Sequence, residues 1–126
     1  MTAKHRALPE KVNLDDKFGR FDQLWEPKII GEINGFYVKI VKIRGEFVWH
    51  RHEREDELFL VIHGKMQLRF REHAVELGPG EMIVVPHGIE HSPMALEETS
   101  VLLVEPRETQ NTGETKSELR TDPEWI

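Results

Sequence analysis

Short apolar runs alternate with turn signals from residue 36 to residue 104. The runs are rich in β-branched and aromatic residues, which favour strands. Asn34-Gly35, Gly78-Pro79-Gly80 and Pro86-His87-Gly88 are typical turn sequences, and they separate the runs at close intervals. The pattern predicts an all-β sandwich or barrel. The predicted strands are residues 36–43, 58–62, 66–70, 82–85 and 101–104.

Two of these strands indicate which faces are buried. Met66, Leu68 and Phe70 alternate with polar residues, so one face of that strand points inward and the other meets water. Residues 58–62 are apolar on both faces, and the outer side therefore needs cover from a second sheet, a helix or another subunit. Because small barrels often find this cover by dimerising, a homodimer is our hypothesis.

The N-terminal region departs from the strand pattern. Residues 1–12 carry mixed charges without periodic apolar positions, which is typical of a mobile arm. A short amphipathic helix is predicted next, with its N-cap at Asn13 and its end before Pro27. We expect its apolar stripe to pack against the barrel, with contact to a ligand as the alternative. The stripe consists of Leu14, Phe18, Phe21 and Trp25.

The C-terminal residues 107–126 form a polar, turn-prone tail that ends in Trp125-Ile126. One interpretation is a disordered tail, and the other is that the apolar pair pins it across the barrel or onto a partner. The predicted organisation is therefore an arm over 1–12, a barrel with its helix over 13–106, and this tail.

Composition narrows the classes of function. The chain has 126 residues, which fits one domain, and its formal net charge of −6 argues against a nucleic-acid binder. No segment has the apolar length of a secretory signal or a membrane span, so we expect a cytoplasmic protein without membrane contact. The sequence contains no cysteine, which excludes disulfides and thiolate ligands and leaves histidines and carboxylates for any metal site.

Candidate metal ligands occur in the segment GEFVWHRHEREDELFLVIHG, which begins at Gly45. His50 and His52 are two residues apart, and on a strand this spacing directs both imidazoles to one face, where they can point into a barrel. Glu57 opens the next strand and can bring a carboxylate beside them. Three possible ligands are therefore close in the sequence.

A second segment, GEMIVVPHGIEH, ends in His91 and offers a fourth ligand. Three neutral nitrogens and one anionic oxygen suit one divalent transition metal such as Fe, Mn, Ni, Cu or Zn. On an octahedral ion, four protein ligands leave two positions open, as a catalytic metal requires. Chance placement of surface histidines is the alternative, but the joint order of glycines, carboxylate, proline and histidines favours a metal site.

These two segments resemble the two motifs of the cupin superfamily. Gly45 to Gly64 is similar to the first motif and Gly80 to His91 to the second, and the spacer between them suits a small single-domain cupin. The resemblance implies a double-stranded β-helix barrel, of the cupin or jelly-roll type. It also implies a metal ion bound by His50, His52, Glu57 and His91.

The sequence departs from the family pattern at two positions. Four residues separate Gly45 from His50, where the family commonly has five, and Ala95 stands where the second motif often has asparagine. Both changes leave the ligand set intact and affect the lip of the barrel.

Further candidate site residues follow from strand alternation. Val48 should face inward with the two histidines, and Phe59 and Val61 with Glu57. Tyr37 and Lys39 share one face of a strand expected near the site, so each is a candidate acid, base or anion contact, with a solvent-facing position as the alternative. Catalytic residues are otherwise unassigned. The expected pocket wall is Val48, Phe59, Val61, Met66, Leu68 and Phe70.

Two functional hypotheses remain open. The first is a metal-dependent enzyme acting on a small oxygen-bearing molecule, because similar small cupins include dioxygenases, isomerases, lyases and polyketide cyclases. The second is a small-ligand or metal binding and sensing protein without turnover, although no helix-turn-helix module accompanies the barrel. The fold hosts many functions, so the site has to decide between them.

Overall fold

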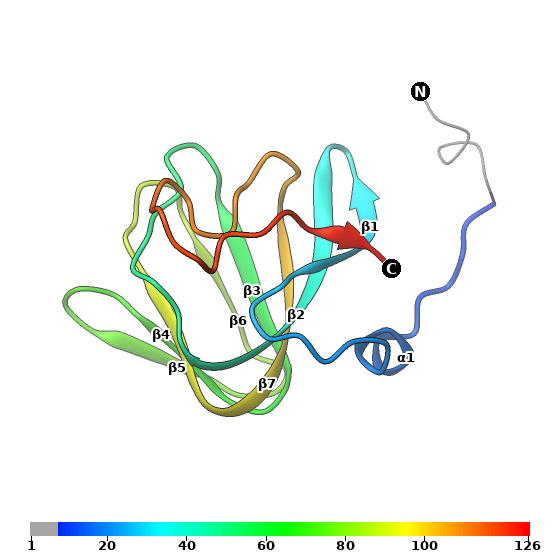
Figure 1. Cartoon of the computed structure of the whole chain (residues 1–126), viewed down its shortest axis with the longest axis horizontal. Coiled ribbons are helices and arrows are strands. Elements are labelled where there is room, and N and C mark those ends of the chain that lie inside the picture. The colour runs from blue at the N-terminus through cyan, green and yellow to red at the C-terminus, as the bar shows by residue number, and fades with distance from the viewer. Residues whose placement is uncertain (1–7) are drawn as a thin grey trace.

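The computed structural model describes residues 8–126 as a strand barrel with one short helix (Figure 1). Residues 1–7 of the predicted arm lie outside the described residues. The elements are α1 (Leu14–Phe18), β1 (Lys28–Ile33), β2 (Phe36–Glu46), β3 (Glu57–His63), β4 (Met66–Arg69), β5 (Ala74–Leu77), β6 (Met82–Val85), β7 (Ser92–Pro106) and β8 (Glu124–Trp125).

The long strand β7 holds the barrel together. Its first residues pair with β4 on one side and with the end of β2 on the other. After the exposed bend at Leu96 to Glu98, its second half is hydrogen-bonded between β2 and β3. The register of β2 shifts between Ile43 and Gly45, and Gly45 has φ = +85°, which favours glycine there. Both long strands therefore bend, as a closed barrel requires.

The barrel interior is an apolar core made by alternate residues of the strands. In β3, Phe59 and Val61 are buried, whereas Leu58 and Leu60 face outward and are half-buried. This alternation is the one that a strand with one inward face produces. The core cluster consists of Val41, Ile43, Phe59, Val61, Met66, Leu68, Leu77, Val85, Ala95, Val101 and Leu103.

Helix α1 is shorter than the apolar spacing predicts. Asn13 caps it as expected, with its side chain accepting a hydrogen bond from the amide of Asp16, but the helix ends at Gly19. Phe18 and Phe21 are buried against Ile40 on the outer face of the barrel. Trp25 lies beyond the helix with φ = +64°. Among the described residues, no helix is long and apolar enough to cross a membrane.

Three strands are absent from the sequence-based prediction. They are β1, β5 and β8. β5 is short and mostly exposed, and it pairs with β4. β1 contains Gly31, where the pairing with β2 changes register. Neither strand has the long apolar run on which strand prediction depends. Both form because they pair with a neighbouring strand, which the local sequence does not reveal.

Residues 107–126, which we call the C-terminal strap, fold back across the barrel and end beside β1 (Figure 1). At its end, β8 pairs in parallel with Lys28 and Ile29, and the ring of Trp125 packs edge-on against Tyr37 at 5.7 Å. Lys17 Nζ donates a hydrogen bond to the backbone oxygen of Ile126 at 2.8 Å. The terminal apolar pair thus pins the tail to the barrel, which is the second of the two arrangements considered above.

The middle of the strap contacts the segment that carries two of the candidate ligands. Thr115 Oγ1 donates to the backbone oxygen of Trp49 at 3.0 Å. Gly113 is buried with φ = +58°, and a Cβ atom at this position would collide with the backbone oxygen of Arg51. The strap can approach this closely only with glycine at position 113.

We predict that Gly113→Ala loosens the strap, because the added Cβ collides with rigid backbone. Gly80→Ala is the matched control, since Gly80 also has positive φ but nothing lies within 4 Å of its Cβ position. In each variant, the left-handed backbone conformation of the new alanine lowers the free energy of unfolding by about 1–2 kcal/mol. Hydrogen exchange should accelerate about tenfold or more at the strap amides in Gly113→Ala alone. Equal strap exchange in the two variants would contradict the close-approach argument.

Candidate metal centre

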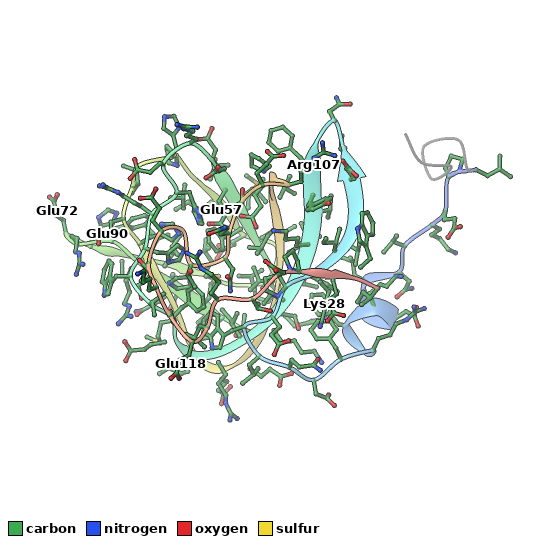
Figure 2. The ribbon with its side chains drawn as sticks, turned by 45° about the horizontal axis from the view of Figure 1, so that its top comes forward. Lys28, Glu57, Glu72, Glu90, Arg107 and Glu118 are labelled. Carbon is green, nitrogen blue, oxygen red and sulfur yellow. The ribbon has the colours of Figure 1, made fainter. Side chains whose placement is uncertain are left out.

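Four ligand side chains converge inside the barrel. His50, His52, Glu57 and His91 are all buried, with at most 6% of each residue exposed. Each offers one ligand atom, and these atoms all lie within 4.8 Å of one another. Figure 2 shows Glu57 among the strands, whereas Glu72 lies at the far tip of the β4–β5 hairpin. The three ligand candidates of the first segment lie 34 to 41 residues before His91 in the sequence, and the fold brings all four to one point.

Backbone pairing brings the two segments together. The amide of His50 donates to the oxygen of His91 at 3.0 Å, and the amide of His91 donates to the oxygen of His50 at 2.9 Å. The amide of Gly88 donates to the oxygen of His52 at 2.8 Å, which fixes the turn before His91. Glu57 is the first residue of β3 and pairs with Val85. These bonds hold all four ligand positions on rigid backbone.

Two of the imidazoles are oriented by backbone carbonyl groups. His50 Nδ1 donates to the oxygen of Val48, and His91 Nδ1 donates to the oxygen of Ile89, both at 2.9 Å. A carbonyl oxygen only accepts, so Nδ1 carries the hydrogen in each ring and Nε2 keeps its lone pair. Metal-binding histidines typically have this arrangement, since the second hydrogen bond fixes the ring.

Three atoms of the cluster are buried without a hydrogen-bond partner. They are His52 Nε2, Glu57 Oε1 and His91 Nε2. Glu57 Oε1 lies 3.3 Å from His52 Nε2 and 3.5 Å from His91 Nε2. Buried polar atoms normally have partners, and leaving one without a partner costs about 1–3 kcal/mol. The two nitrogens and the carboxylate oxygen point their lone pairs toward one another. Such an arrangement is suited to a cation bound between them.

The electrostatic environment keeps Glu57 available as an anionic ligand. Burial opposes its ionisation, but the adjacent His52, His91 and Glu105 outweigh burial, so the pKa of Glu57 lies well below its ordinary value. The opposite holds for Glu105, because burial and the nearby Glu57 raise its pKa well above the ordinary value. The two carboxyl groups therefore have distinct roles, with the negative charge held at Glu57.

A small cavity of about 40 Å³ lies beside the cluster. This volume holds only a few water molecules, and it is far below the ~300–1,000 Å³ of typical ligand pockets. His50 and Glu57 contribute to its wall, and Asn111 of the strap lies on its wall as well. The full set of lining residues is Trp25, Pro27, Val41, Phe47, His50, Glu57, Phe59, Pro93, Leu103, Glu105 and Asn111.

The residues expected in the pocket wall lie in different places. Phe59 lines the cavity, whereas Val61, Met66 and Leu68 are buried in the core cluster away from it, and Phe70 packs against that cluster. Val48 is half-buried, and its backbone oxygen holds His50. Instead of Val48, the neighbouring Phe47 lines the cavity, with its ring edge-on to His50 at 5.4 Å. Residues 47–49 are not part of a regular strand, so simple alternation does not apply to them.

The two candidate catalytic residues lie outside the cavity wall. Tyr37 is half-buried and packs against Trp125. Lys39 is only 1% exposed and forms an ion pair with Glu105, with 2.9 Å between Nζ and Oε1. Sequence reasoning missed Glu105, although its position directly after the apolar run 101–104 placed a carboxyl at the end of a buried strand.

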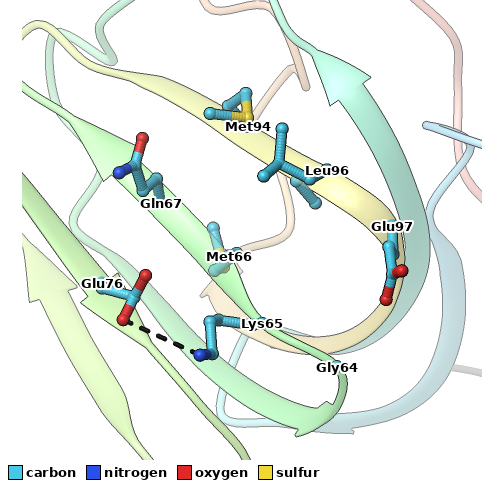
Figure 3. A pocket seen from close by; sticks show the side chains of 9 residues that line it. Gly64, Lys65, Met66, Gln67, Glu76, Met94, Leu96 and Glu97 are labelled. Carbon is cyan, nitrogen blue, oxygen red and sulfur yellow. Dashed lines mark ion pairs between the residues drawn. The ribbon is translucent and has the colours of Figure 1, made fainter.

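A larger cavity of about 430 Å³ lies away from the cluster (Figure 3). Its wall includes Met66 and Gln67 of β4 and Met94 of β7, together with the exposed Leu96. Lys65 and Glu76 form an exposed ion pair at 4.0 Å on its rim. None of the four clustered residues lines this cavity, and none of the unpartnered buried atoms of the described residues belongs to it.

Comparison with known proteins agrees with this architecture. The model of the cupin domain family (Cupin_2) matches residues 37–105. A crystal structure of a cupin-2 domain containing protein from Shewanella frigidimarina NCIMB 400 has 43% sequence identity and a TM-score of 0.76, and the match covers 84% of this chain and 100% of that chain. A crystal structure of a Neisseria meningitidis protein has 31% identity and a TM-score of 0.71, covering 77% and 99%. The uncharacterized protein YdbB of Bacillus subtilis (strain 168) is 29% identical over 82 residues, which is 64% of this chain and 73% of YdbB.

The chain belongs to the cupin domain family, which confirms the resemblance and the predicted fold class. Within this family fold, the buried three-histidine, one-glutamate cluster is suited to one metal ion.

Burial, with a further contribution from His91, lowers the pKa of His50 from 6.5 to about 4. Between these two values the unfolded chain binds a proton that the folded protein does not, so the free energy of unfolding should decrease as the pH falls through this interval. The loss from His50 amounts to at most about 3 kcal/mol. Urea denaturation of metal-free protein at pH 7 and pH 5 should reveal it. His50→Gln should show a smaller decrease, and an equal decrease would rule out His50 as its source.

Proposed function

We propose that the protein binds one divalent transition metal through His50, His52, Glu57 and His91 and uses it as an enzyme on a small oxygen-bearing molecule. The observation that carries the proposal is the set of buried, unpartnered ligand atoms on His52, Glu57 and His91. Iron, manganese, nickel, copper and zinc are the candidate ions for this donor set. When bound, such a metal supplies Lewis-acid chemistry, and redox chemistry if it is not zinc.

The chain's own residues define what this site can accept. The carbonyl groups of Val48 and Ile89 hold two imidazoles in place, and the aromatic rings of Phe47 and Phe59 exclude water from one side. The cavity accepts only a ligand of water or dioxygen size. A larger substrate requires another approach, and a second cavity of about 550 Å³, lined by His52 and by residues of the strap, adjoins the cluster on that side. Dioxygenase, isomerase, lyase and cyclase activities all remain within the proposal.

The same cavity volume favours one alternative function. If ligands reach the metal only through this small cavity, the site suits a metal-binding or sensing cupin without turnover. The two functions differ in whether the metal-loaded protein converts a small organic molecule. Product formation from candidate hydroxy or carbonyl compounds supports the enzyme, and binding without product supports the binder.

We predict that purified wild-type protein carries near-stoichiometric transition metal, measured by inductively coupled plasma mass spectrometry. His52→Ala and His91→Ala should lose it, because each removes one of four ligands. His87→Ala is the matched control, since His87 lies four residues before His91 but has a largely exposed side chain. The ligand assignment would be refuted if His52→Ala and His87→Ala contained equal amounts of metal, both as purified and after metal has been added.

We also propose that the outer face of β3 and β6 is buried in a homodimer. Leu58 pairs with Val84, and Leu60 pairs with Met82, so half-buried leucines adjoin exposed apolar residues across these strands. Met82 is 53% exposed and Val84 is 48% exposed. Among the described strands, β6 pairs with β3 alone, so its other edge is open to a second copy.

We predict a particle of about twice the 14.8 kDa chain mass by multi-angle light scattering. Val84→Glu should convert it to a monomer by burying a charge at the interface. Leu96→Glu is the control, since Leu96 is 87% exposed in a different part of the barrel. A monomeric wild-type protein would contradict the proposal.

A further inference from the structure

The barrel interior contains a buried ion pair. Lys39 and Glu105 are 1% and 2% exposed, and Lys39 Nζ lies 2.9 Å from Glu105 Oε1. Removing two charges from water is costly, and replacement of a buried pair by apolar residues of similar volume is often neutral or stabilising. A reason other than stability should therefore explain why a lysine and a glutamate are buried beside the apolar core and the ligand cluster.

Strand register places this pair next to the metal cluster. Leu58 of β3 pairs with Val104 of β7, so continuing the antiparallel register by one residue sets Glu57 opposite Glu105. Both carboxyl groups face the barrel interior and line the same small cavity. On the other side of β7, Lys39 pairs with Leu103, two residues from Glu105. Lys39 of β2, Glu105 of β7 and Glu57 of β3 thus lie near one another on three adjacent strands, and we call them the row.

One oxygen of this row has no partner. Glu105 Oε1 is held by Lys39, whereas Glu105 Oε2 is buried without any hydrogen-bond partner. Carboxylates that bind metals are commonly held by a second group that fixes their orientation. Glu105 is placed to do this for Glu57.

We infer that Glu105, anchored by Lys39, is a positioning residue that orients the Glu57 carboxylate for metal binding. This inference rests on the proposed metal site. Lys39 fixes one carboxyl oxygen of Glu105. The other oxygen, which has no other partner, can hold Glu57 toward His52 and His91 through a proton shared between the two carboxyl groups. Lys39 also offsets the second buried carboxyl, so that the anionic ligand does not face an uncompensated negative neighbour.

The test compares two double variants, because Glu105→Leu alone leaves Lys39 buried without its partner. Lys39→Met/Glu105→Leu removes the pair and the carboxyl group beside Glu57. Lys39→Met/Glu105→Gln also removes the pair but keeps an amide that can hydrogen-bond to Glu57. Glu32→Leu is the control, since it removes another ion pair, that with Arg107, away from the cluster. Urea denaturation establishes that each variant is folded.

The measurement is titration of metal-free protein with Co²⁺, whose visible absorption reports both affinity and ligand geometry. We expect Co²⁺ affinity to fall about 10- to 100-fold in the leucine double variant, with a changed absorption band. The glutamine double variant and Glu32→Leu should stay within about threefold of wild type. Rescue by glutamine distinguishes positioning from a packing role, because both double variants lack the ion pair.

Two results would overturn the inference, and they are distinguishable. Wild-type affinity and an unchanged spectrum in the folded leucine double variant would show that the pair is structural, while the metal site itself stands. Absence of Co²⁺ binding in wild-type protein would overturn the proposed metal site together with this inference.

Discussion

The structure depends on a group of polar ligand atoms buried where a barrel would otherwise place apolar side chains. His52, Glu57 and His91 each expose a lone pair to the others inside the protein, and no hydrogen of the chain satisfies them. Such atoms cost folding energy in the absence of a cation, and a cation converts that cost into binding energy. The surrounding backbone bonds keep the ligands in place despite the cost, because the His50–His91 pairing is part of the barrel itself.

Strand β7 connects this constraint to the rest of the fold. It begins directly after His91, and Glu105, one residue before its end, lies next to Glu57 and Lys39. Its middle bonds to β2 and β3 and supplies the buried Val101 and Leu103 of the core. The same strand therefore closes the barrel, positions one end of the ligand cluster and carries the neighbouring carboxyl. The C-terminal strap continues from it and lies against the ligand-bearing segment at Trp49 and Arg51.

The sequence predicted the fold class and named the four side chains that cluster in the structure, because period-two alternation and motif spacing are local signals. The helix was predicted too long because spacing alone continues the apolar stripe to Trp25, whereas the chain leaves the helix at Gly19. Burial of Lys39 could not be predicted, because its partner Glu105 lies 66 residues away and only strand register brings them together.

The cavity wall was the least predictable part of the site. Phe47 replaces Val48 because residues 47–49 do not keep strand geometry. Asn111 reaches the wall only because the strap folds back, and the close approach of Gly113 that permits this depends on a tertiary contact with Arg51. Local pattern carries no information about such contacts between distant segments.

X-ray absorption spectroscopy of the metal-loaded protein tests the central claim most directly. The account predicts a first shell with three imidazole nitrogens and one carboxylate oxygen at about 2.0–2.2 Å, together with the outer-shell scattering that imidazole rings produce. A first shell of oxygens with one imidazole or none would place the metal elsewhere and contradict the account.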